Sequence, residues 1–214
     1  MSIGGEKKGT RQRLLESAAA IFTEKGYANT SVADICERAG ANIASVNYHF
    51  RSKDALYRSV LQFTSEQAEA YYPISWSPEN NPETRLYQFV LALLQRILSR
   101  EMAGNFYILF AKEMVEPTVA SGGIISQAIA RHHDVMKEII RDICGREIDE
   151  ELSLRLHFSI LSQCFFISYN EKGRQHHLQK NLIQFKDAEV FARHIADFSL
   201  AGMRCCCSLS GDLH

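Results

Sequence analysis

The sequence has no long hydrophobic run and little proline. None of its 214 residues lies in an apolar stretch of about eighteen or more, the length that a membrane-spanning helix needs. The N-terminal segment MSIGGEKKGTRQR is charged and lacks the apolar core of a secretory signal peptide. Three of the four prolines lie between residues 71 and 84, where a helix must break. These absences predict a cytoplasmic protein with no membrane partner.

The six cysteines do not have the spacing of a disulfide framework, and we expect reduced thiols. They are Cys36, Cys144, Cys164 and the run Cys205 to Cys207. Three consecutive cysteines also lack the spacing of zinc sites, and adjacent histidines on a helix point about 100° apart. No metal site is therefore predicted. A metal sensor and an oxidisable tail stay open as less favoured interpretations of the C-terminal run.

Strand signals are scarce as well. No alternating Val, Ile and Thr runs are bracketed by turn pairs, whereas apolar residues recur three to four positions apart throughout. The sequence therefore predicts an all-α protein. The expected helices begin near Thr10, Ser31, Asn42, Ser52, Asn81, Asn105, Ile124, Asp149 and Asp187.

Charge is uneven along the chain, although the net charge is only -1. Residues 1–60 hold nine Lys and Arg against six Asp and Glu, or +3, and residues 61–214 hold fifteen against nineteen, or -4. Lys7, Lys8, Arg11 and Arg13 cluster near the N-terminus. A basic end favours contact with nucleic acid, although charged termini are commonly just solvated.

Two short helical patterns meet at Gly40. The first follows Thr30 and Ser31, both good N-cap types, and the second opens at Asn42 and lasts about two turns. A glycine in the turn lets two helices cross closely, as they do in a helix-turn-helix. Such a unit places its second helix in the major groove of DNA. For this pattern taken alone, an ordinary helical corner is the alternative.

The second helix carries the side chains that base contact requires. Asn47 can pair with adenine, Ser45 can meet a base edge or a phosphate, and an aliphatic side chain can pack on a thymine methyl. Val46 and Phe50 form its apolar inner face. Lys53, at the start of the next helix, is placed to meet a phosphate.

The run TRQRLLESAAAIFTEKGYANTSVADICERAGANIASVNYHFRSKDALYRSVL closely resembles the N-terminal DNA-binding domain of the TetR family of transcriptional regulators. The resemblance rests on Ala18, Phe22 and Gly26, on the TSVADIxxxAG helix and on the YHFxSKDxL exit, and it covers about the first quarter of the chain. The C-terminal half, FAKEMVEPTVA above all, is similar to the branch of this family with a CecR-type C-terminal domain.

The resemblance implies which residues meet DNA. Its groove-facing positions fall on Ile43, Ala44, Ser45, Asn47 and Tyr48. Its backbone contacts fall on Thr30 or Ser31, Asn42, His49 and Lys53. Many members have Tyr where this chain has Asn47, so a phosphate contact there is either replaced by base readout or lost.

The resemblance also implies a function. It implies a ligand-responsive homodimer, a repressor that a small molecule releases from a pseudo-palindromic double-stranded DNA operator. We expect a helix-turn-helix DNA-binding domain over residues 1–52 and a helical ligand-binding and dimerisation domain over residues 53–214. The alternative is a helical small-molecule- or partner-binding protein with a non-functional DNA-binding head.

Apolar stripes predict the effector and dimer contacts. Phe106, Phe110 and Met114, with Glu113 beside them, are expected to line a pocket for a hydrophobic, aromatic or cationic effector, and plain core packing is the alternative. Dimerisation is expected through the last two long helices. Their faces hold Leu154, Phe158, Leu161, Phe165, Phe191, Ile195 and Phe198.

No catalytic motif occurs. The sequence has no glycine-rich phosphate loop, no G-x-S-x-G elbow and no H-E-x-x-H pair. We expect neither an enzyme nor a bound cofactor.

Overall fold

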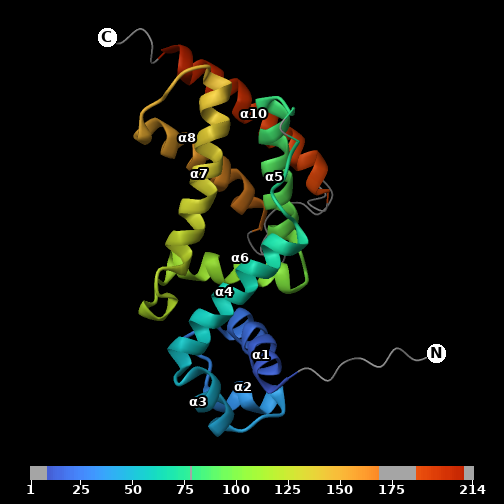
Figure 1. Cartoon of the computed structure of the whole chain (residues 1–214), viewed down its shortest axis with the longest axis vertical. Coiled ribbons are helices and arrows are strands. Elements are labelled where there is room, and N and C mark those ends of the chain that lie inside the picture. The colour runs from blue at the N-terminus through green and yellow to red at the C-terminus, as the bar shows by residue number, and fades with distance from the viewer. Residues whose placement is uncertain (1–8, 78, 169–186, 210–214) are drawn as a thin grey trace, which may run out of the picture. The chain divides into compact units, whose positions relative to one another are not determined.

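The computed structural model describes residues 9–77, 79–168 and 187–209, and every regular element in these ranges is helical (Figure 1). The predicted all-α class is confirmed. The elements are α1 (Thr10–Lys25), α2 (Val32–Ala39), α3 (Ile43–Phe50), α4 (Lys53–Tyr71), α5 (Pro82–Leu98), α6 (Met102–Val115), the 3-10 helix η1 (Val119–Ser121), α7 (Ile124–Cys144), α8 (Glu150–Ser168) and α10 (Ala188–Leu209).

Side-chain caps fix where several helices begin. Ser31 accepts a hydrogen bond from the backbone N–H of Asp34, and the Asp34 carboxylate accepts one from the backbone N–H of Ser31. Asn81 caps α5 with proline at its first turn. Ser52 and Asp149 accept bonds from the first turns of α4 and α8. The helix starts predicted at these residues are confirmed, because the caps satisfy backbone donors that have no partner inside the helix.

The chain forms two compact units, and unit 1 consists of Met1–Ala70 with Arg100–Gln127. In its described part, α1 packs against α2, α3 and α6. Phe22 and Tyr57 lie edge to face at the centre, with ring centroids 4.9 Å apart. Gly40 ends α2 in the left-handed conformation, with φ 57°. A side chain at this position would be strained, so the predicted glycine turn is confirmed.

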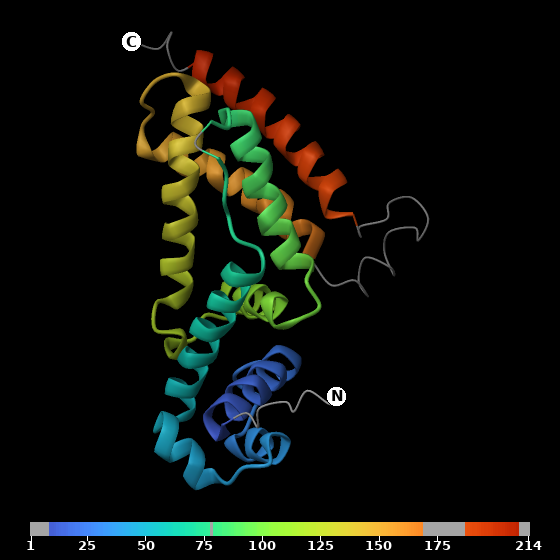
Figure 2. The same cartoon turned by 45° about the vertical axis from the view of Figure 1, so that its right-hand side comes forward.

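Unit 2 consists of Tyr71–Ser99 with Ala128–His214. Helices α5 and α10 lie side by side, and α8 packs on both (Figure 2). The core of this unit is built from apolar side chains of α5, α7, α8 and α10. It includes Leu86, Phe89, Leu93, Met136, Ile139, Ile160, Ala192 and Ile195.

Cys144 and Cys207 form a disulfide that joins the C-terminal end of α7 to α10. Their Cα atoms are 5.7 Å apart, within the range that a disulfide spans. The expectation of reduced thiols is wrong for these two residues, because folding brings together cysteines that are 63 positions apart. Cys36, Cys164, Cys205 and Cys206 remain thiols. In the described ranges, no helix combines the length and apolarity needed to cross a bilayer.

Candidate functional site

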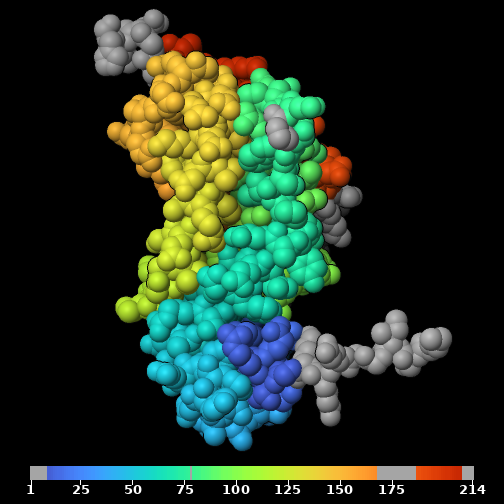
Figure 3. All heavy atoms as spheres, in the orientation of Figure 1, coloured from blue at the N-terminus to red at the C-terminus, as the bar shows by residue number. Residues whose placement is uncertain are grey.

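Helix α3 has one buried and one exposed face. Val46 and Phe50 are 1% and 5% exposed, whereas Ile43 and Tyr48 are 54% and 83% exposed. Asn47 lies on the exposed face with them. In the space-filling view, α2 and α3 make up the surface at one end of unit 1 (Figure 3). The helix therefore offers about two turns of mixed polar and apolar side chains to a partner.

The turn before α3 uses some of the predicted contact residues for its own structure. The Asn42 side-chain oxygen accepts bonds from the backbone N–H of Ser45 at 2.8 Å and from the Ser45 hydroxyl at 2.9 Å. Thr30 is 3% exposed, and its hydroxyl donates to the carbonyl of Gly26 at 2.7 Å. Ser31 is exposed and caps α2. Of the predicted backbone contacts, Thr30 is thus the one that lies inside the fold.

Lys53 is held beside the end of α3. Its Nζ lies 4.2 Å from the centroid of the Tyr27 ring, a cation–π contact. The Tyr27 hydroxyl donates to the Asp54 carboxylate. Burial, together with this bond, raises the pKa of Tyr27 to about 12, so the hydroxyl stays protonated at neutral pH. These contacts attach the first turn of α4 to the loop after α1 and hold the lysine charge next to α3.

Arg51 is a further candidate, not predicted from the sequence. It ends α3 with φ 69°, and in the described ranges it is the only residue other than glycine with a positive φ. The backbone N–H of Ser52 donates to the carbonyl of Phe50 at 2.9 Å, so Arg51 sits at the centre of a strained three-residue turn. Its exposed guanidinium adds a second positive charge beside Lys53. No sequence signal marked it, because such a turn favours glycine.

Two of the basic residues near the N-terminus belong to α1 and support the α2–α3 unit. The Arg11 guanidinium lies 5.4 Å from the centroid of the Phe50 ring. Arg13 Nε donates to the carbonyl of Ala39 at 3.2 Å, at the end of α2. Lys7 and Lys8 lie outside the described residues.

Unit 2 contains a buried polar cluster around Phe89 that the sequence did not indicate. His132 and His157 pack edge to face on this ring, with centroids 5.9 and 6.5 Å away, and His133 lies 5.3 Å from His157. Arg96 Nη1 approaches His132 Nε2 at 3.4 Å. Three helices, α5, α7 and α8, thus bring polar groups to one place in the core.

Among the described residues of unit 2, several polar side-chain atoms in and near this cluster's helices are buried without a hydrogen-bond partner. They include Gln88 Oε1, His133 Nδ1, Ser153 Oγ and both ring nitrogens of His157. Burial, with the charge of Arg96 adding to it, lowers the pKa of His132 to about 3. Burial also lowers the pKa of His157 to about 4, with His133 as the smaller cause. Both imidazoles are therefore neutral near pH 7, and the cluster has polar atoms to offer to water or to a polar ligand.

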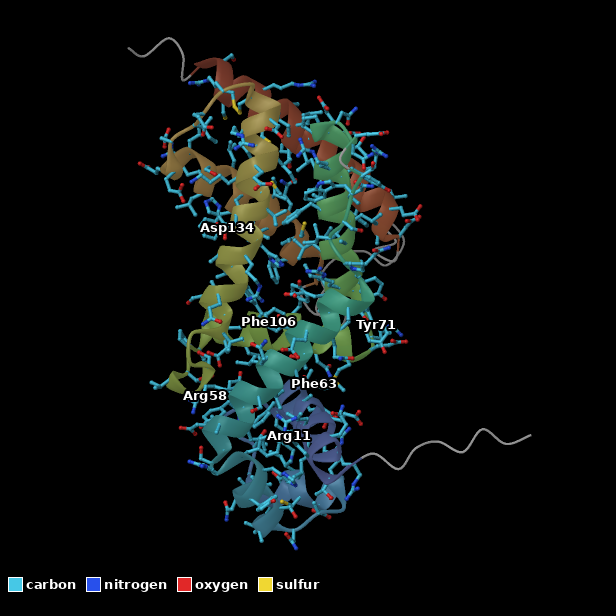
Figure 4. All side chains as sticks on the ribbon, viewed as in Figure 1. Arg11, Arg58, Phe63, Tyr71, Phe106 and Asp134 are labelled. Atoms are coloured by element: carbon cyan, nitrogen blue, oxygen red, sulfur yellow. A yellow bond between two sulfur atoms is a disulfide. The ribbon has the colours of Figure 1, made fainter. Side chains whose placement is uncertain are left out.

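Arginines line two of the grooves on the surface of the described residues. In unit 1, a groove of about 370 Å³ runs between α1 and α4, and Arg11, Arg58 and Phe63 lie along it (Figure 4). In unit 2, a groove of about 520 Å³ lies at the C-terminal end of α7. Its lining includes Arg85, Arg141, Asp142, Arg146 and Glu147. Among the described residues, no group of three or more His, Cys, Asp and Glu is placed to hold a metal ion.

Two family models match the chain. The model of bacterial regulatory proteins, tetR family, matches residues 14–60, which include the α2–α3 unit. The model of the HTH-type transcriptional dual regulator CecR, C-terminal domain, matches residues 82–203, more than half of the chain. The chain is a TetR-family transcriptional regulator with a CecR-type C-terminal domain. Its family is one of DNA-binding regulators, not of enzymes.

Relatives of this regulator include YttP of Bacillus subtilis, a probable HTH-type transcriptional regulator. It is 28% identical over 157 residues, which cover 72% of this chain and 73% of YttP. IcaR of Staphylococcus aureus, the negative regulator of the biofilm operon icaADBC, is 25% identical and covers 61% of this chain and 68% of its own.

Solved structures share the fold of the regulator. PfmR of Thermus thermophilus, a TetR-family regulator, has a TM-score of 0.65 at 22% identity and covers 91% of this chain and 97% of its own. AibR, solved with isovaleryl coenzyme A and operator DNA, has a TM-score of 0.64 at 17% identity, with the same coverage of both chains.

The segment predicted to meet an effector lies on α6 of the regulator. Phe106, Phe110 and Glu113 are buried, whereas Met114 is 59% exposed. The Glu113 carboxylate accepts bonds from the Tyr57 hydroxyl at 2.8 Å and from the backbone N–H and hydroxyl of Thr118 at 2.9 and 2.8 Å. Burial and this carboxylate raise the pKa of Tyr57. Glu113 thus links α6 to α4 and to the chain before η1, and an effector contact here stays a prediction.

The predicted dimer faces of the regulator contain both exposed and buried side chains. Phe158 and Phe198 are 46% and 66% exposed, whereas Leu161 and Ile195 lie in the core of unit 2. Leu154, Phe165 and Phe191 are intermediate in exposure. Phe166 and Val190 are also exposed, at 61% and 62%, and were not predicted. Apolar periodicity identified the two helices but could not tell which of their apolar residues the chain itself covers.

Proposed function

We propose that this regulator is a homodimeric repressor that binds a pseudo-palindromic operator through α3 and leaves it when a small molecule binds. One observation carries the proposal: α3 exposes a two-turn face while Val46 and Phe50 anchor it in unit 1. The major groove of B-DNA admits one α-helix. A face that has no role in the core and carries amide, hydroxyl and aliphatic groups is suited to that groove.

In this proposal the exposed residues divide between bases and phosphates. Asn47 and Tyr48 read base edges, and Ile43 and Ala44 pack on apolar base surfaces. Phosphates are contacted by Ser31, Asn42, His49 and Lys53. The Ser45 hydroxyl donates to Asn42, so its oxygen can accept a hydrogen bond from a base edge. Thr30, being buried, acts by positioning Ser31.

We further propose that the exposed apolar side chains of α8 and α10 form the dimer interface. Phe158, Phe166 and Phe198 supply large apolar surfaces that monomeric proteins rarely leave in contact with water. Two copies related by a two-fold axis would cover these faces with a four-helix bundle. Such a dimer presents two α3 helices to two half-sites.

The effector acts, in this proposal, by binding the DNA-incompetent state of the dimer better than the competent one, because equal binding shifts nothing. The predicted contacts are Phe106, Phe110, Glu113 and Met114, which suit an aromatic or hydrophobic compound. The buried polar cluster of unit 2 favours a second location, because its unpartnered atoms would bind a ligand that both donates and accepts hydrogen bonds. We also propose that the regulator acts in the cytoplasm. In this proposal residues 1–52 bind DNA, and residues 53–214 bind the effector and form the dimer.

Selection from a random DNA pool by the purified protein tests the operator. The expected result is an inverted repeat whose half-sites are about one helical turn apart. A folded, dimeric protein that enriches no sequence, with or without a library of hydrophobic compounds, would instead favour a partner-binding protein with a silent DNA-binding head.

Two substitutions test the division of roles on the selected operator. Lys53→Ala should weaken binding to every sequence and lower the salt slope by about one, because it removes one phosphate contact. Asn47→Ala should change preference at one or two base pairs, costing about 1–3 kcal/mol there. Arg155→Ala, an exposed cation of α8, is the control. If Asn47→Ala weakened binding equally on all sequences, its base-reading role would be refuted.

A further inference from the structure

The Cys144–Cys207 disulfide lies beside the groove at the end of α7. Cys144 is the last residue of α7. Gly145, which follows it, and Asp142, two positions before it, line this hollow of about 520 Å³. Cys144 is partly exposed, whereas Cys207 is 7% exposed. Of the two bonded cysteines, Cys144 is therefore the more accessible to a reagent.

The groove carries more positive than negative charge at the disulfide. Arg85 and Arg141 both bond Asp142, at 2.6 and 3.3 Å. Arg146 donates to the carbonyl oxygen of Cys207 at 2.7 Å. This contact holds the positive charge of Arg146 next to Cys207. The lining of the groove holds three arginines against two carboxylates, those of Asp142 and Glu147.

We propose that Cys144–Cys207 is a thiol–disulfide exchange site for an anionic low-molecular-weight thiol, whose carboxylate the arginines of the groove bind. This role lies beyond DNA binding and does not depend on it. A guanidinium next to a disulfide attracts a carboxylate-bearing thiol, and it also stabilises the thiolate that leaves when the disulfide opens.

The exchange takes two steps. The thiolate of the small molecule attacks Sγ of Cys144, a mixed disulfide forms there, and Cys207 leaves as a thiolate beside Arg146. A second thiolate attacks the sulfur of the small molecule in the mixed disulfide, so Cys144 leaves and the two small molecules become one disulfide. Two protons from the small thiols end on Cys144 and Cys207. The protein gains two electrons, and the small thiols lose two.

Opening the bond leaves α10 attached to unit 2 by other contacts. Arg204 pairs with Glu83 of α5 at 2.6 Å. Met203 and Ile195 are 1% and 2% exposed, within the core. The reduced protein should therefore keep its fold, as a reversible exchange site requires.

The rate of opening by three small thiols tests the proposal on the full-length protein. The protein is oxidised with glutathione disulfide, and peptide mapping identifies the Cys144–Cys207 link. Opening by glutathione, neutral 2-mercaptoethanol and cationic cysteamine is then followed by alkylation and mass spectrometry, with rates expressed per thiolate. At low salt, glutathione should be about tenfold faster than 2-mercaptoethanol and cysteamine slower, and the differences should shrink as salt is added.

Substitutions test the arginines of the groove and the cysteines of the disulfide separately. Arg146→Gln and Arg141→Gln should each remove most of the advantage of glutathione and leave the rate with 2-mercaptoethanol unchanged, whereas Arg155→Gln should change neither. Cys144→Ser should abolish the linked peptide, and Cys205→Ser should not. Equal rates for the three thiols, no salt dependence, or no Cys144–Cys207 peptide after oxidation would each overturn the proposal. Circular dichroism checks that every variant is folded.

Discussion

Buried polar side chains are bonded differently in the two units of this regulator. In unit 1, Glu113 accepts three hydrogen bonds, and the hydroxyls of Thr30 and Thr64 donate to backbone carbonyls. In unit 2, the hydroxyl of Ser153 and both ring nitrogens of His157 are buried and have no partner among the described residues. Each unpartnered polar atom costs free energy, because it has lost its bonds to water.

This difference suggests different tasks for the two interiors. Among the described residues of unit 1, every buried side-chain N or O atom has a hydrogen-bond partner, and such an interior can hold α3 in one position. The interior of unit 2 contains polar atoms whose bonds are still to be made, and a water or a bound molecule would supply them.

Breaking the bonded network of unit 1 should have the largest effect. Glu113→Ala leaves the Tyr57 hydroxyl and the Thr118 N–H without their acceptor, and we expect a loss of about 3 kcal/mol. Hydrogen exchange resolved by peptide should show the loss in α4 and α6. Tyr57→Phe, which removes one of the bonds, should cost about 1 kcal/mol. Unchanged protection of both helices in Glu113→Ala would mean that the network does not hold unit 1 together.

Acid should destabilise unit 2 through its neutral histidines. The pKa of His157 is about 4 in the folded protein and about 6.5 in the unfolded chain. The unfolded state therefore binds more protons between these values, and stability present above pH 6.5 is lost as the pH falls toward 4, by on the order of 3 kcal/mol.

Urea unfolding followed by the fluorescence of Trp76, the single tryptophan, measures this loss. His157→Leu should flatten the dependence between pH 6.5 and 4, whereas His194→Gln, an exposed histidine of α10, should not. An identical pH profile in wild type and His157→Leu would remove His157 as its cause.

The backbone strain of unit 1 can be relieved at Arg51. Glycine adopts a positive φ without steric cost, so Arg51→Gly should raise stability by about 1 kcal/mol. The same variant should weaken DNA binding, because it removes an exposed cation next to α3. Arg51→Ala is the control: it removes the charge and keeps the strain. Equal stability of the Gly and Ala variants would show that the turn is not strained.

Removing a bonded hydroxyl and removing an unpartnered one should change stability differently, although both changes are small. Thr30→Val in unit 1 removes a bonded hydroxyl and should cost about 1 kcal/mol. Ser153→Ala in unit 2 removes a buried hydroxyl that has no partner among the described residues. Because its desolvation cost is removed with it, stability should rise by about 1 kcal/mol. Denaturation midpoints give both values. A large loss in Ser153→Ala would mean that its hydroxyl is bonded in solution, and the contrast between the units would fail there.

Local features of this fold were predictable from the sequence, and contacts between distant segments were not. The starts of α2, α5 and α8 could be predicted from Ser31, Asn81 and Asp149, because a capping side chain bonds to the backbone only two or three residues further on. The Tyr57–Glu113 bond joins residues 56 positions apart, and no periodic pattern encodes it. The Cys144–Cys207 bond and the histidine cluster depend in the same way on how the helices pack.

The candidate site shows the same limit. Asn47, Tyr48 and Lys53 could be predicted as DNA contacts because they stand in a short motif with fixed spacing. Arg51 was not predicted, because the turn after α3 imposes its positive φ, and the residue at this position is not the glycine that usually indicates such a turn. On α8 and α10 the periodic pattern identified the apolar residues but not their exposure. Phe158 is exposed and Leu161 is buried, because the other helices of unit 2 cover only Leu161.

The division of α3 into a buried and an exposed face has a consequence for evolution. Val46 and Phe50 hold the helix in place, so substitutions there cost stability, whereas Ile43, Ala44, Asn47 and Tyr48 can vary with little effect on folding. If these residues read bases as proposed, a duplicated gene can acquire a new target sequence by a few surface substitutions that leave the stability of the protein unchanged.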